Sequence, residues 1–279
     1  RLISTGNEAS LDMSDALDFL VEDPDTRVIC LAVESVRRPQ AFLEAVNRAI
    51  AAGKPVIALK LGRSRQGRAI AQSHTGAISG DPWAFEAICR QHGVEIAHDL
   101  TELIDRAICF EQLPAAKWSP LEGLAIVTAS GGGAGMASDF CEDMGIALPA
   151  LDCIAGQVSE VVPGVQVVNP LDMTGFTVGN AEASMKLLRA YAESDAVDTL
   201  LLQWFVDEGG VEHGAAFLNA FAEIAGTSRK ALMLASLEDG EIGEWAGRLP
   251  ATGAAVARGL PGTLRSLQSM GRFVRRADR

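Results

Sequence analysis

One histidine lies in a segment whose residue types suit the handling of a phosphate. Residues 60–80 read KLGRSRQGRAIAQSHTGAISG, with Ser73, Thr75 and Gly76 around His74. Small residues let backbone N–H groups approach an anion, and the three arginines raise the local potential. A histidine there can act as a nucleophile toward a phosphoryl group. The residues alone leave open an exposed loop histidine with no chemical role.

A carboxylate is the candidate partner of this histidine. Glu34 ends the apolar run RVICLAVE, and His74 follows the run KPVIALKL. Both positions lie beyond the carboxyl ends of predicted strands, where ligands bind in open α/β sheets. A carboxylate that accepts a hydrogen bond from one ring nitrogen fixes the tautomer and leaves the other nitrogen free. A solvated carboxylate at a strand end is the alternative.

A second glycine-rich segment, TASGGGAG at residues 128–135, lies between an apolar strand and an amphipathic helix. Its candidate phosphate-binding residues are Ser130, Gly131, Gly132 and Gly133, because glycines free the backbone N–H groups at a helix N-terminus. No lysine follows, so the spacing does not match a nucleotide P-loop. A dinucleotide-binding turn and a plain tight turn stay open.

The remaining histidines and the cysteines are interpreted as structural. His92 precedes a glycine at a predicted helix end, His98 adjoins the predicted N-cap Asp99, and His213 is predicted to start a helix. No cysteine has metal-ligand spacing with them, and no GxSxG motif is present, so neither a metal site nor a serine hydrolase is predicted. The five scattered cysteines are typical of a reducing compartment.

Apolar strand candidates alternate with amphipathic helix candidates, which favours parallel sheets with helices on both faces. The segment Leu113–Pro120 contains two prolines and is the predicted linker. We therefore expect two doubly wound α/β domains, residues 1–116 and 117–279. Predicted strands are residues 2–5, Arg27–Val33, Lys54–Leu61, Val94–Ala97, Leu124–Thr128, Thr199–Trp204 and Ala231–Ala235; predicted helices are Gln40–Ala52, Trp83–His92, Ala137–Met144, Ala215–Ala225 and Pro261–Val274.

Composition narrows the classes of function. The formal net charge of −12 argues against a nucleic-acid binder, which normally carries a basic surface. No apolar run reaches the roughly 18 residues that cross a membrane, and no charged-then-apolar leader is present. The sequence therefore predicts a cytoplasmic protein.

Motifs along the chain resemble the NDP-forming (ADP-forming) acyl-CoA synthetases. In the first half these are STGNE at residues 4–8, DPDTR at 23–27, KPV at 54–56, GRS at 62–64 and SHTGA at 73–77. IVTASGG at 126–132 and NPLD at 169–172 resemble the domain that follows in the same enzymes. The resemblance implies a succinyl-CoA-synthetase-like domain followed by a flavodoxin-like ligase domain.

The resemblance also implies roles for residues. His74 aligns with a histidine that carries the phosphoryl group from an acyl phosphate to a nucleoside diphosphate. Glu34 aligns with the carboxylate that orients the ring, and Ser130–Gly133 with a helix N-terminus that receives the phosphorylated ring. Gly6 and Asn7 are added as possible phosphate contacts. The positive end of a helix dipole suits a phosphoryl group, which carries about −1.5 to −2 charges near pH 7.

Parts of these enzymes have no counterpart in the sequence. They are the CoA-binding domain, the first strand and helix of the histidine domain, and the nucleotide-binding ATP-grasp part. We therefore expect no cofactor on this chain alone, and CoA, a magnesium nucleotide and a carboxylic acid or acyl-CoA as substrates of a larger, oligomeric enzyme. The alternatives are a non-catalytic acyl-CoA-sensing or scaffold module and a flavin or dinucleotide binder.

Overall fold

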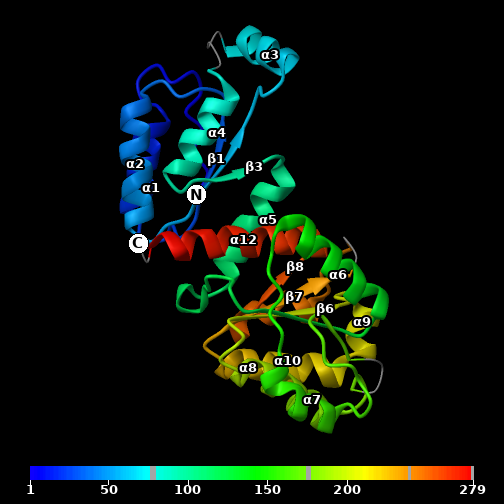
Figure 1. The fold of residues 1–279 in the computed structure, drawn as a ribbon. Coiled ribbons are helices and arrows are strands. Elements are labelled where there is room, and N and C mark those ends of the chain that lie inside the picture. The colour runs from blue at the N-terminus through cyan, green and yellow to red at the C-terminus, as the bar shows by residue number, and fades with distance from the viewer. Residues whose placement is uncertain (76–79, 174–176, 238–239, 278–279) are drawn as a thin grey trace. The chain divides into compact units, whose positions relative to one another are not determined.

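The chain forms two compact units in this computed structural model (Figure 1), Arg1–Ala107 with the chain end from Arg275, and Ile108–Val274. The structure describes residues 1–75, 80–173, 177–237 and 240–277, with the backbone alone at 71–75. Each unit contains one sheet of parallel strands. The predicted α/β class with two parallel-sheet, flavodoxin-like folds is confirmed.

The segment predicted as a linker lies in the second unit, and the division falls earlier, within one helix. An aromatic cluster explains the difference. The Trp118 ring lies 5.1 Å from that of Phe110 and 5.6 Å from that of Phe273, both edge-on. The Trp118 ring nitrogen also donates to Leu113 O at 3.1 Å. Aromatic packing therefore fixes this proline-containing segment to the second unit.

The first unit has a three-stranded sheet in the order β1-β2-β3. Its elements are α1 (Met13–Glu22), β1 (Ile29–Val33), α2 (Pro39–Ala51), β2 (Val56–Lys60), α3 (Arg65–Thr75), α4 (Pro82–Gln91), β3 (Glu95–Ala97) and α5 (Leu100–Gln112). One apolar cluster joins α1, α2 and α4 to the strands. Along β1, Ile29, Leu31 and Val33 are buried while Cys30 and Ala32 are exposed. The second face of β1 is therefore uncovered within the described residues.

The N-terminal residues depart from the prediction. Residues 2–5 form no strand, although they were predicted to be one. An isolated extended segment leaves its backbone N–H and C=O groups to water, and a strand forms only where a neighbouring strand pairs with them. The chain enters regular structure at α1, where Asp12 is the N-cap of a capping box with Asp15.

The second unit has five parallel strands in the order β5-β4-β6-β7-β8. Its elements are η1 (Ala115–Lys117), β4 (Leu124–Thr128), α6 (Gly131–Met144), η2 (Asp152–Ile154), α7 (Ala155–Val161), β5 (Leu171–Asp172), α8 (Ala181–Glu193), β6 (Thr199–Trp204), α9 (Glu208–His213), α10 (Ala215–Thr227), β7 (Ala231–Ser236), α11 (Glu244–Gly247), η3 (Leu249–Thr252), β8 (Ala255–Ala257) and α12 (Leu260–Ala277). In Figure 1, α6 and α12 lie over one face of this sheet, and α7, α8 and α10 over the other. The strand order is that of flavodoxin, with a topological switch point between β4 and β6.

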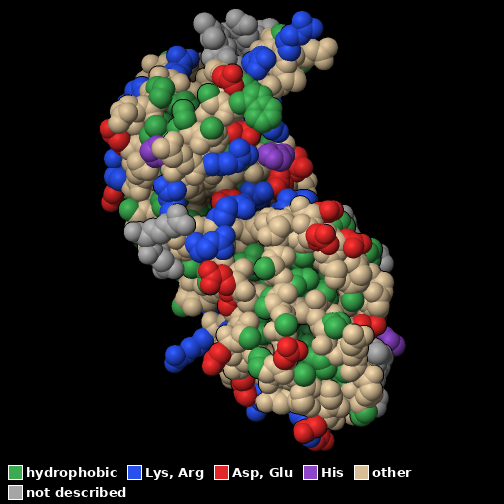
Figure 2. All heavy atoms as spheres, viewed as in Figure 1, with side chains coloured by type: hydrophobic (Ala, Val, Ile, Leu, Met, Phe, Trp, Pro, Cys, Tyr) green, Lys and Arg blue, Asp and Glu red, His purple; other side chains and the backbone are tan. Residues whose placement is uncertain are grey.

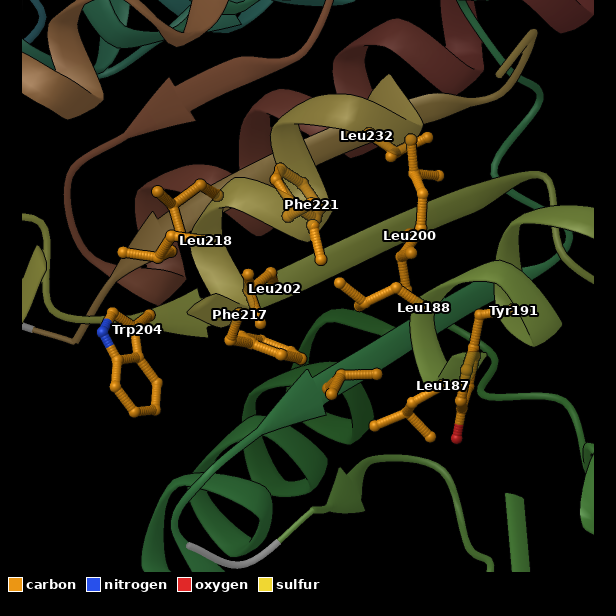
Figure 3. Close-up of a cluster of buried hydrophobic side chains, with 14 of the residues drawn as sticks. Leu187, Leu188, Tyr191, Leu200, Leu202, Trp204, Phe217, Leu218, Phe221 and Leu232 are labelled. Atoms are coloured by element: carbon orange, nitrogen blue, oxygen red, sulfur yellow. The ribbon is translucent and has the colours of Figure 1, made fainter. Parts of the chain in front are cut away.

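The core of the second unit explains its apolar strands. Every residue of β4, β6 and β7 is buried, because helices cover both faces of the sheet. Figure 3 shows Leu200 and Leu202 of β6 pointing toward Phe217 and Phe221 of α10 and Leu188 of α8. Burying a Leu or Phe side chain contributes about 1.5–3 kcal/mol, so this cluster fixes the strands that carry the candidate site.

Candidate functional site

The candidate residues of the first unit lie at the carboxyl ends of two paired strands. Val33, the last residue of β1, is the register partner of Lys60, the last residue of β2. Glu34 follows β1 directly and is half-buried. The segment that leads into α3 follows β2. Glu34 and the chain carrying His74 thus leave the sheet at the same edge.

His74 lies in a helix and not in a loop. Residues 65–75 form α3, whereas the glycine-rich stretch that follows the predicted strand Lys54–Leu61 was predicted as a loop. Ser64 explains the difference: its Oγ accepts from Gly67 N at 2.9 Å and its carbonyl from Arg68 N at 2.9 Å, as in a helix N-cap. Ser73, His74 and Thr75 are in the last turn of α3, with their side chains outside the described atoms. Gly76 lies outside the described residues.

The arginines of this segment have different environments. Arg63 Nε lies 2.9 Å from Glu86 Oε1 on α4, whose side chain is 3% exposed. Arg90 lies 3.1 Å from the other oxygen of Glu86. Arg63 is therefore engaged in the ion pair that ties the start of the segment to α4. Arg65 and Arg68 lie on α3, and blue side chains lie over this helix in Figure 2.

A buried lysine completes this edge. The Lys60 ammonium donates to Glu34 O at 2.6 Å and to Leu61 O at 2.7 Å, and it lies 6.0 Å from the centre of the Phe85 ring. Burial lowers the pKa of Lys60, the charge of Glu34 opposes this change, and the charge of Arg68 adds to it. The Lys60 ammonium therefore binds the main chain just after both strands, at Glu34 and at Leu61.

Gly6 and Asn7 form a turn before α1. Gly6 has a φ of +55°, a conformation that glycine adopts without strain. Asn7 O accepts from Arg37 Nη2 at 2.9 Å, and Glu8 lies 3.4 Å from Arg37 Nε. Since Arg37 follows β1, this turn is attached to the chain that leaves the carboxyl end of the sheet.

The glycine-rich segment of the second unit is the first turn of α6. The helix begins at Gly131, earlier than the Ala137 start predicted from sequence. Ser130 is its N-cap, and Ser130 Oγ accepts from Gly133 N at 3.1 Å. Glycine residues were predicted to stay in the loop, but a capping serine compensates for their weak helix propensity. Gly131 and Gly132 are exposed. The N–H groups of the first turn of a helix have no partner within the helix and can stabilise an anion at its N-terminus.

Three polar residues at this helix start were missed in the sequence. A Cβ on Gly133 would lie 2.9 Å from Thr128 Oγ1 and 3.0 Å from Gln203 Oε1. A Cβ on Gly131 would lie 3.1 Å from Asp172 Oδ2. Thr128 ends β4, and Asp172 and Gln203 are its register partners on β5 and β6. Polar residues at the carboxyl ends of apolar strands were the available signal, but only the strand order brings them together.

The other histidines are placed as follows. His92 is the C-cap of α4, and its Nδ1 lies 2.8 Å from Asn47 Oδ1. Next to His98, Asp99 Oδ1 accepts from Glu102 N at 2.7 Å, as predicted for an N-cap. His213 ends α9, so the prediction that it starts a helix was wrong; Asp207 is the N-cap instead. In the described part of the chain, no group of three or more His, Cys, Asp or Glu residues could hold a metal ion. Nor is any described helix long and apolar enough to cross a membrane.

Comparison with known proteins identifies relatives of the chain. Residues 1–110 match the family described as the succinyl-CoA ligase like flavodoxin domain. The alpha subunit of ADP-forming acetate–CoA ligase I from Pyrococcus furiosus is 32% identical over 205 residues, covering 72% of this chain and 43% of the relative. A prokaryotic trans-feruloyl-CoA synthase is 34% identical over 247 residues, covering 85% of this chain and 34% of the relative. The chain thus spans less than half the length of these relatives.

A solved structure resembles both units. The acetyl-coenzyme A synthetase 1 of Ca. Korarchaeum cryptofilum, solved with phosphate and ADP, matches with a TM-score of 0.83 and 25% identity. The match covers 99% of this chain and 59% of that one.

Proposed function

We propose that the chain is the phosphoryl-relay part of an ADP-forming acid–CoA ligase. Two comparisons support this: residues 1–110 match the succinyl-CoA ligase like flavodoxin domain, and most of the chain is similar to such ligases. The observation that carries this proposal is the common edge of β1 and β2. Glu34 leaves the sheet beside the segment that becomes α3, the helix of His74. Glu34 and the helix that carries His74 thereby follow neighbouring strand ends of one parallel sheet.

The relay has three balanced steps. Phosphate attacks an acyl-CoA, the thioester breaks, and CoA leaves with formation of an acyl phosphate. A ring nitrogen of His74 then takes the phosphoryl group and releases the carboxylic acid. A nucleoside diphosphate finally accepts the group and regenerates the histidine. CoA, magnesium nucleotide and acid are substrates of the complete enzyme, which needs further CoA-binding and ATP-grasp parts.

The residues have distinct roles in this scheme. Glu34 accepts a hydrogen bond from one ring nitrogen of His74, so that the other nitrogen keeps its lone pair for the phosphorus. The N–H groups of the first turn of α6 are the proposed phosphate contacts of the second unit, and Ser73, Thr75 and Gly76 are those next to the histidine in the first. Phosphoryl transfer depends mainly on such positioning and charge stabilisation.

Labelling of the full-length enzyme with radioactive ATP and magnesium tests the proposal. We expect acid-labile label on the wild type and none on His74→Ala. Glu34→Gln should slow labelling by about 100-fold, because a misplaced ring loses its attack geometry. His92→Ala is the matched control, since His92 caps α4 and binds Asn47. Label that persists in His74→Ala would contradict the relay.

A further inference from the structure

A buried lysine joins the two strand ends from which Glu34 and α3 depart. Lys60 is the last residue of β2 and is 3% exposed. Its Nζ donates to the carbonyl oxygens of Glu34 and Leu61 at 2.6 and 2.7 Å. One ammonium group therefore binds the main chain directly after β1 and directly after β2.

The last hydrogen bond between the two strands lies beside this cation. Leu61 N already donates to Val33 O at 2.9 Å, which continues the ladder to the edge of the sheet. A buried ammonium is costly unless hydrogen bonds and opposite charge compensate it. Here two carbonyl oxygens accept from Lys60, and the charge of Glu34 acts favourably on it. Part of the compensation therefore comes from Glu34, which the proposed relay uses to orient the histidine.

We propose that Lys60 is a positioning residue, which fixes the main chain of Glu34 and thereby its carboxylate relative to the segment that carries His74. The inference rests on the proposed function and deepens it. Lys60 acts through Glu34 and not on the phosphoryl group. A hydrogen bond between carboxylate and imidazole depends steeply on distance and angle, so a freed Glu34 main chain orients the ring less well.

The chain offers a matched control at the opposite end of the same strand. Lys54 precedes β2, and its Nζ donates to the carbonyl oxygens of Leu20, Val21 and Asp23 at 3.0, 2.6 and 2.8 Å. Lys54 thus makes the same kind of lysine–carbonyl contacts, to the end of α1 and the residue after it. It lies away from the strand ends that carry Glu34 and α3.

The experiment compares Lys60→Met, Lys60→Arg and Lys54→Met in the full-length enzyme by initial rates of histidine labelling from ATP and magnesium, with thermal melting of each variant. We expect Lys60→Met to slow labelling by about 10- to 100-fold, as a small displacement near a reacting group does. Lys60→Arg should recover most of the rate, because a guanidinium also donates to carbonyls. Lys54→Met should lower the melting temperature about as much as Lys60→Met does, but it should label at nearly the wild-type rate. Equal slowing by Lys54→Met, or no slowing by Lys60→Met, would overturn the proposal.

Hydrogen exchange separates this proposal from the proposed function. Lys60→Met should speed exchange of the Leu61 amide, while Lys54→Met should speed that of Ile29, which donates to Pro55 O at the other end. Unchanged exchange at Leu61 in Lys60→Met would refute the clamp even in an enzyme that labels His74. Label persisting in His74→Ala refutes the relay, and with it the positioning role, even where Leu61 exchange responds.

Discussion

Thr128 of β4 and Gln203 of β6 are register partners whose side-chain oxygens both end beneath the first turn of α6. Neither Thr128 Oγ1 nor Gln203 Oε1 has a hydrogen-bond partner in the described structure. A Cβ atom at position 133 would lie only 2.9 Å from Thr128 Oγ1 and 3.0 Å from Gln203 Oε1. The close approach of helix and sheet at the switch point therefore depends on Gly133.

Gly133→Ala should lower the free energy of unfolding by about 1–3 kcal/mol, because the added methyl group would overlap the buried Thr128 and Gln203 side chains and force them or the helix to shift. Denaturant unfolding measures the change. Gly135→Ala is the control in the same helix: its Cβ would meet nothing within 4 Å. Alanine has the higher helix propensity, so the control should be more stable by up to about 1 kcal/mol. Equal stabilisation by both substitutions would contradict the close contact.

The Asn169 side chain pairs with the backbone of β4 at residues that β5 does not reach, since β5 pairs only with Val127 and Thr128. Its Nδ2 donates to Leu124 O at 2.8 Å, and its Oδ1 accepts from Ile126 N at 3.0 Å. Asn169→Leu removes both bonds at a buried strand, and each unsatisfied buried backbone group costs about 1–3 kcal/mol. Urea unfolding should show this loss. Asn169→Asp should also destabilise at neutral pH, because a carboxylate faces Leu124 O without a donor; a neutral result for both would refute the pairing role.

Asp12 should make stability depend on pH. It caps α1, and Arg38 binds both of its carboxylate oxygens, at 2.6 and 2.7 Å. These contacts hold the pKa of Asp12 well below its usual range. The unfolded chain therefore binds the proton more readily, with a pKa of about 3.9, so this stabilisation is complete above that pH and is lost as the pH falls below it.

Asp12→Asn tests this, since asparagine keeps the capping ability and removes the charge. The variant should be less stable than the wild type at pH 7, and the difference should shrink below pH ~4. Thermal melting across pH measures it. Asp12→Ala should cost about 1 kcal/mol more through loss of the cap. A difference that grows at low pH would contradict the sign.

Arg63 and Arg90 share one buried carboxylate, but they should matter unequally. Arg63 pairs with Glu86 between the segment after β2 and α4, whereas Arg90 pairs with it within α4 at i,i+4. A fully exposed i,i+4 pair contributes about 0.3–0.5 kcal/mol, and in the Arg90–Glu86 pair the arginine side chain is 55% exposed. Arg63→Ala should cost more than Arg90→Ala in urea unfolding, because it also detaches the segment that leads to His74. The reverse order would show that Arg90 is the main partner of Glu86.

Local patterns predicted most strands, several helices and the candidate edge residues. They failed where glycines were given more weight than a single cap: the helix that follows Ser64 was not predicted, and the helix that Ser130 caps was predicted without its first turns. The strand predicted at residues 2–5 was wrong for another reason: β-propensity alone forms no strand where no neighbouring strand pairs with the segment.

The sequence by itself determined the apolar strands, the caps and the motif around His74, because these depend on residues a few positions apart. Only the tertiary structure decided that Lys60 binds the main chain of Glu34, 26 residues away, and that Gln203 meets Gly133. Such contacts follow from strand order and register, which are set by burial across the whole sheet. A side chain whose partner lies on another strand therefore leaves no periodic signal in the sequence.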